Sequence, residues 1–198
     1  MQDENFSPQE SLRLIEAMIN QAKNRFSEDG YLYLLWGWAV LACSAAQFVL
    51  MHFFHSPYHY YVWMVTWVLL IYQVFYLRKK HKKEKVRTYA SNIIGFVWLT
   101  FLIMLFLFSF LIGNMEGGDY YRHISPIMLA TYGMPVFLSG IILRFPPLIL
   151  GGIGCWVLST IAPIVDYEYQ LLLVPAAMLI AWIIPGYLLR RKYKSQMA

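Results

Sequence analysis

The stretch MHFFHSPYHYY holds three of the five histidines of this chain, His52, His55 and His59. Imidazole is a common metal ligand and carries protons near neutral pH. His52 and His55 share one helix face if the helix extends that far, and Pro57 would let His59 fold back towards them. With His123 and nearby carboxylates, these rings could hold zinc, copper or nickel. The other interpretation is an amphipathic boundary at the wet end of a membrane helix.

A second candidate site consists of uncharged polar residues and prolines inside apolar segments. Asn92, Thr131 and Ser159 could line a ligand pocket, or they could only join helices by hydrogen bonds. Pro135 and Pro175 each free a backbone carbonyl, and broken helices can build binding sites at mid-membrane depth. No charged residue lies deep in these segments, which disfavours a proton-driven pump. No enzyme signature is present, so we expect neither catalysis nor a cofactor.

Long apolar segments must position these residues. The chain is 59% hydrophobic and 14% charged, whereas a soluble domain has roughly 25% charged residues. A membrane-spanning helix needs about 20 apolar residues, and lipid cannot satisfy open backbone groups, so we expect an all-α polytopic membrane bundle. Six segments meet this requirement: Tyr31–Phe53, Tyr60–Leu77, Tyr89–Ile112, Ile124–Leu143, Leu148–Ile164 and Leu171–Leu189.

The distribution of lysine and arginine predicts the orientation. If six helices alternate, fifteen of the 16 basic residues fall on one side and only Arg122 on the other. Basic residues favour the cytoplasmic side, so both termini are expected there. The densest cluster should face anionic lipid headgroups rather than nucleic acid, for which no binding module is present. It contains Arg78, Lys79, Lys80, Lys82 and Lys83.

Residues 1–30 form a separate predicted unit, an amphipathic cytoplasmic helix before the membrane domain of residues 31–198. The sequence SPQE is a capping box, and an apolar stripe follows at helical spacing, namely Leu12, Ile15, Ile19 and Phe26. This unit has six acidic and three basic residues, a net charge of −3, whereas residues 78–87 have +6. We therefore expect the stripe to contact protein near the basic loop. The alternative is a helix in the lipid interface.

A weak internal pattern suggests three related helical hairpins. The odd-numbered segments share Gly-Trp-Ala-Val-Leu, Gly-Phe-Val-Trp-Leu and Gly-Cys-Trp-Val-Leu, and the even-numbered ones end in Leu-Arg. Convergence explains the same pattern, because small residues pack membrane helices closely and arginine ends cytoplasmic spans. Gly113, Gly133 and Gly140 could also support an interface in a homo-oligomer.

Four stretches carry a family resemblance: SLRLIEAMINQAK, YLYLLWGWAVLACSAAQFVL, LRFPPLILGGIGCWVL and YEYQLLLVPAAMLIAWIIPGYLLR. In them the chain resembles a group of small uncharacterised bacterial inner-membrane proteins with six helices and no established activity. The resemblance implies location in the bacterial cytoplasmic membrane and nothing catalytic. We expect a non-enzymatic membrane protein that binds a protein partner or a small ligand. The rival is a small transporter or channel, with a path between helices three to six.

Overall fold

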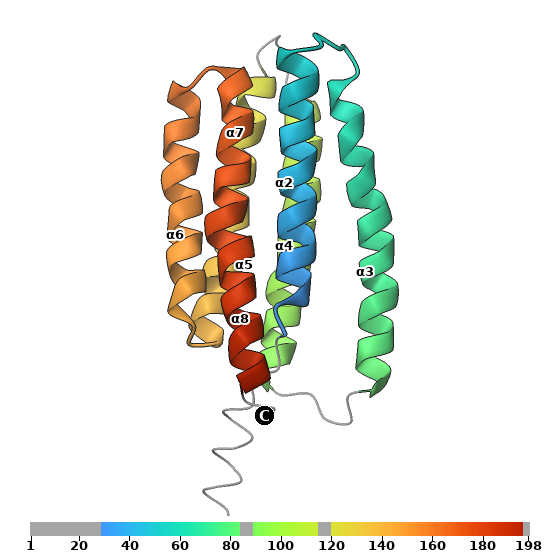
Figure 1. Cartoon of the computed structure of the whole chain (residues 1–198), viewed down its shortest axis with the longest axis vertical. Coiled ribbons are helices and arrows are strands. Elements are labelled where there is room, and N and C mark those ends of the chain that lie inside the picture. The colour runs from blue at the N-terminus through green and yellow to red at the C-terminus, as the bar shows by residue number, and fades with distance from the viewer. Residues whose placement is uncertain (1–28, 84–88, 115–119, 196–198) are drawn as a thin grey trace, which may run out of the picture.

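The computed structural model describes residues 29–83, 89–114 and 120–195, and these ranges contain helices and no strand (Figure 1). The stripe Leu12, Ile15, Ile19 and Phe26 lies outside them. The helices run along the long axis of one bundle. The elements are α2 (Tyr31–His52), η1 (His59–Trp63), α3 (Met64–Lys83), α4 (Tyr89–Gly113), α5 (Tyr121–Ile142), α6 (Pro146–Ile161), η2 (Ala162–Ile164), α7 (Tyr167–Met178), η3 (Leu179–Ile183) and α8 (Ile184–Ser195).

Within those ranges, six helical segments are long and apolar enough to cross a membrane. This confirms the all-α class and the number of predicted segments. The segments begin or end differently by a few residues; the fifth, for example, starts at Pro146. Phe145 before it is extended, because a residue that precedes proline avoids the helical region, and proline suits the first helical position.

The sixth segment is longer than predicted and runs from Tyr167 to Ser195 as α7, η3 and α8. Its middle part, η3, is a π-helix in which the Ile184 N–H donates to the Leu179 carbonyl. Pro185 follows and has no N–H to donate, so one α-helical hydrogen bond is lost at this point in any case. The π-helical turn lies next to that missing hydrogen bond. Pro175 lies inside α7 without ending it.

The tightest packing joins α5 and α6, where glycines allow close backbone approach. A Cβ at Gly152 would lie 2.7 Å from the Phe137 Cβ and 2.9 Å from the Gly133 oxygen. A Cβ at Gly140 would lie 2.7 Å from the Ile149 nitrogen. Two glycines considered for a homo-oligomer interface, Gly133 and Gly140, are therefore buried inside the chain.

By contrast, α3 is held at the edge of the bundle mainly by polar contacts with α2. No residue in the most apolar stretch of the second span is buried. In the fourth and sixth spans, half of the residues in the corresponding stretch are buried. In Figure 1, α3 forms the right-hand edge. Apolar contact between helices gains little in lipid, so hydrogen bonds and close packing must hold it. The three-hairpin relationship stays a prediction, since α2–α3 and α5–α6 pack by different means.

Several polar contacts join α2, and Asp29 just before it, to α3 and η1. The Trp36 indole N–H donates to the Gln73 Oε1, and the Trp63 N–H donates to the Gln47 Oε1 at 2.6 Å. Others lie near the start of α2. They are the hydroxyl pair Tyr31–Tyr72 at 3.0 Å and the Asp29 carboxylate with the Tyr76 hydroxyl at 3.3 Å and the Lys80 Nζ at 3.7 Å.

We expect Gln73→Leu to loosen the end of α3 near Lys83. It leaves the Trp36 N–H without its acceptor, which costs about 0.6–1.7 kcal/mol for a hydrogen bond between membrane helices. Hydrogen–deuterium exchange in α3 should rise several-fold, while exchange in α5 and α6 stays unchanged. Thr66→Val is the control, because the Thr66 hydroxyl bonds only to the Trp63 carbonyl three residues earlier. Equal exchange in both variants would contradict a role for the Trp36–Gln73 contact.

Candidate functional site

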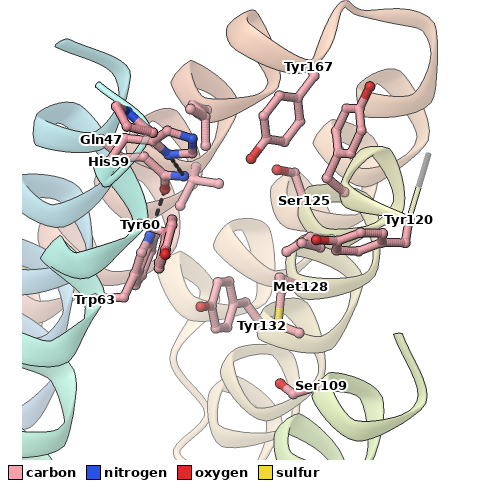
Figure 2. Close-up of a pocket in the computed structure, with 15 residues that line it drawn as sticks. Gln47, His59, Tyr60, Trp63, Ser109, Tyr120, Ser125, Met128, Tyr132 and Tyr167 are labelled. Carbon is pink, nitrogen blue, oxygen red and sulfur yellow. Dashed lines mark hydrogen bonds between the residues drawn. The ribbon is translucent and has the colours of Figure 1, made fainter. Parts of the chain in front are cut away.

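A cavity of about 750 Å³ lies at the end of the bundle that carries His52, His59 and His123, here called the histidine end (Figure 2). The opposite end carries Arg78 and Arg144 and is called the basic end. This volume is in the range of small-molecule sites. Residues from α2, η1, α4, α5 and α7 line the cavity, and its polar residues are Gln47, His59, Tyr60, Trp63, Ser109, Tyr120, Tyr121, Ser125, Tyr132 and Tyr167.

Among the described residues, no Asp, Glu, Lys or Arg lines this cavity. Its polar character comes from hydroxyl, amide, indole and imidazole groups, beside apolar residues such as Met128 and Val174. The cavity therefore offers hydrogen bonds and ring faces but no fixed charge, which suits a neutral ligand more than an ion.

Two hydroxyl groups on α5 point into the cavity (Figure 2). The Ser125 side chain is 4% exposed, and neither it nor Tyr132 has a hydrogen-bond partner among the described residues. Because both hydroxyls open onto the cavity, a polar group that enters it can bond to them without breaking a contact within the protein. Ser125 and Tyr132 therefore have hydrogen-bonding capacity that the protein does not use.

The opposite wall of the cavity is fixed by Gln47, whose side chain is 5% exposed. Its Oε1 accepts from the Trp63 indole, and its amide nitrogen lies 3.1 Å from the His59 Nδ1 (dashed lines in Figure 2). An indole can only donate, so the amide oxygen must face Trp63 and the amide N–H must face His59. The Nδ1 of His59 then accepts, and its ring proton lies on Nε2. One amide thus orients both rings.

The inner limit of the cavity is an aromatic cluster that reaches towards the basic end. Tyr132 packs against Phe101 and Trp182, with ring centroids 5.8 and 6.4 Å apart. Trp182 contacts Trp98 at 5.1 Å, and Trp98 contacts Tyr33 near the start of α2 at 5.6 Å. Of these five residues only Tyr132 lines the cavity, so the other four rings lie behind it.

The residues predicted for a ligand pocket lie elsewhere. Asn92 is exposed near the basic end of α4. The Thr131 hydroxyl donates to the Ile127 carbonyl of its own helix at 2.6 Å, and the Ser159 hydroxyl donates to the Pro126 carbonyl at 2.8 Å. None of these three residues lines the cavity. The two interior prolines do not line it either: Pro135 is buried and Pro175 is half-buried in the packing between helices.

The four histidines predicted to bind a metal have separate surroundings. The His52 Nδ1 lies 3.2 Å from the Glu168 Oε2, whereas His59 bonds to Gln47. His55 and His123 are exposed. Among the described residues, no three His, Cys, Asp or Glu side chains come close enough to hold a metal ion. The four-histidine site is therefore not assembled in this part of the chain.

The basic residues predicted to face lipid headgroups lie in the last turns of α3. Arg78, Lys79 and Lys82 are exposed, as a headgroup contact requires. Lys80 is half-buried and pairs with Asp29, so it also helps to join α2 to α3. Helix α3 ends at Lys83.

The sequence carried a partial signal for the cavity. Gln47 is a polar residue within an apolar segment, and the tyrosines and Trp63 gather at the segment ends. Such aromatic residues are expected at membrane boundaries whether or not they line a cavity. Their presence in the sequence therefore does not show that they surround one cavity. Ser125 and Tyr132 stand out only because the fold leaves their hydroxyls facing that space.

Comparison with protein-family models, with curated proteins and with solved structures gives no match to this chain. The fold and the cavity therefore define its class on their own. The part of the chain that the structure describes is all-helical, with six segments long and apolar enough to span a membrane and a cavity at the histidine end lined by aromatic and uncharged polar residues.

Proposed function

We propose that this chain is a non-enzymatic integral membrane protein that binds a small neutral ligand in the cavity at the histidine end. It lies in the bacterial cytoplasmic membrane, with both termini and the basic end in the cytoplasm. The distribution of 16 basic residues, fifteen to one between the two sides, supports this orientation. Its likeness to small six-helix bacterial inner-membrane proteins is part of the same proposal.

The observation that carries the proposal is the pair of hydroxyls on Ser125 and Tyr132. They face a cavity of about 750 Å³ and have no partner among the described residues. Near the membrane interior, each hydroxyl gains most by bonding to a polar group that enters the cavity. A neutral molecule with an apolar body and one or two polar atoms meets this need.

A non-enzymatic role fits the chemistry of the lining. General acid–base catalysis needs a group that can exchange a proton at the reacting atom. The described lining residues include no carboxylate, amine or thiol, the Nδ1 of the His59 imidazole is engaged by Gln47, and the other proton donors are weakly acidic hydroxyls. The rival function, transport along a path between helices three to six, would require the rings behind Tyr132 to move apart.

A binding experiment tests this proposal. We expect neutral aromatic fragments such as 2-naphthol to bind the purified protein saturably, as measured by ligand-observed NMR. Naphthoate and naphthylmethylamine, which carry a charge, should bind at least tenfold more weakly because the lining offers no opposite charge. Ser125→Phe places a phenyl ring in the cavity and removes the Ser125 hydroxyl, so it should abolish binding of the neutral fragment.

The matched control is Ser159→Ala, which removes a serine hydroxyl that bonds to Pro126 outside the cavity. It should bind the fragment as the unaltered protein does. The proposal fails if no neutral fragment binds saturably, or if Ser125→Phe, still folded by circular dichroism, binds as well as the unaltered protein.

A further inference from the structure

One side of the cavity is not fully closed by any of the described helices. Helix α3 packs along α2 and η1, and α4 packs along α5, but α3 and α4 do not pack extensively against each other. The cavity is nevertheless lined by Tyr60 and Trp63 from η1 and by Ser109 from α4. It therefore extends into the space between these two elements.

This side opening lies within the apolar part of α4. Ser109 is four residues before the helix end at Gly113, which is about 6 Å along the axis at 1.5 Å per residue. Its neighbours Phe106 and Phe110 are 69% and 62% exposed. In a membrane, exposed phenylalanines at this depth would contact hydrocarbon, so the opening faces lipid rather than water.

We infer that the ligand is a bilayer-soluble molecule with a flat ring head carrying carbonyl oxygens, a quinone-type lipid, and that it enters sideways between η1 and α4. This inference rests on the proposed function and names its ligand class. The hydroxyls of Ser125 and Tyr132 donate to the carbonyl oxygens of the head. The rings of Tyr60 and Trp63 on the facing wall pack against its plane.

The remaining features of the cavity agree with this class of ligand. The described lining residues carry no charge, and a quinone head has none. The Ser125 and Tyr132 hydroxyls can donate as well as accept, and carbonyl oxygens, which only accept, use their donor capacity. A volume of about 750 Å³ holds the head and the first part of a tail, and the opening beside Ser109 lets the rest of the tail lie in lipid.

The experiment uses the full chain in phosphatidylcholine nanodiscs and two probes: decylubiquinone and the same benzoquinone without its decyl tail. Binding is followed by quenching of tryptophan fluorescence. We expect saturable quenching by both probes. Ser125→Ala combined with Tyr132→Phe should weaken both by about tenfold, because two hydrogen bonds are lost. Ser109→Trp, which narrows the side opening, should slow association of the tailed probe several-fold and leave the tail-free probe unchanged.

Leu102→Trp is the matched control, since Leu102 is also exposed on α4 but does not line the cavity. It should leave the association of both probes unchanged. The inferred ligand class is overturned if dioleoylglycerol, which has no ring, displaces decylubiquinone at equal concentration. The side entry is overturned if Ser109→Trp and Leu102→Trp slow the tailed probe equally or not at all.

These outcomes are distinguishable from failure of the proposed function. If neutral fragments bind and Ser125→Phe abolishes their binding, but decylubiquinone does not bind, only the quinone-type ligand is rejected. If no neutral compound binds at all, the proposed function and this inference fail together.

Discussion

Gly152→Ala is expected to lower the free energy of unfolding by about 1–3 kcal/mol, the usual cost of overpacking a tight contact. The new Cβ would lie 2.7 Å from the Phe137 Cβ and 2.9 Å from both its Cα and the Gly133 oxygen. Two of these three atoms are backbone atoms, which cannot rotate away. Helix α6 must therefore move away from α5, with loss of the close packing that holds membrane helices together.

The measurement is an unfolding titration with sodium dodecyl sulfate in mixed micelles. Gly95→Ala is the control, because a Cβ at Gly95 would meet no heavy atom within 4 Å. Alanine favours the helix over glycine by up to about 1 kcal/mol, so Gly95→Ala should be neutral or stabilising. If both variants unfold at the same mole fraction of dodecyl sulfate, Gly152 is not in close contact with Phe137 and Gly133.

Gln47→Leu is expected to destabilise the histidine end and to weaken ligand binding in the cavity. It leaves the Trp63 N–H without an acceptor and the His59 Nδ1 without a donor. Each polar group left unpaired costs about 1–3 kcal/mol. Since α3 has few other contacts, η1 and the start of α3 should separate from α2. The same titration measures the loss, and quenching by decylubiquinone measures the effect on the cavity.

A double-mutant cycle gives the control for this prediction. Trp63→Phe removes the indole donor and keeps an aromatic ring, so Gln47→Leu combined with Trp63→Phe leaves no unpaired group between these two positions. Removing both partners costs less than the sum of the single losses, because no buried group remains unsatisfied at that contact. Strictly additive losses would show that the Gln47–Trp63 hydrogen bond does not hold α3 to α2.

The amino-acid sequence by itself determined the elements. Six apolar blocks of spanning length can only be helices in lipid, and residues such as Pro146 and His52 lie within a few positions of the predicted ends. The one-sided distribution of basic residues predicted an orientation, because that rule depends on composition near the helix ends and not on packing. The predicted pocket residues were chosen because they are polar, without knowledge of the helix face on which they lie. They therefore lie outside the cavity.

Only the tertiary structure decided which faces meet. Thr131 and Tyr132 are adjacent in sequence, yet one hydroxyl bonds within its own helix and the other faces the cavity. That difference depends on the rotation of α5 about its axis, which close packing of glycines against α6 sets. Gln47 and Trp63 likewise became partners only when η1 turned back onto α2. Helical rotation and pairing depend on contacts distant in sequence, so the cavity and its two unpaired hydroxyls emerge only in the folded chain.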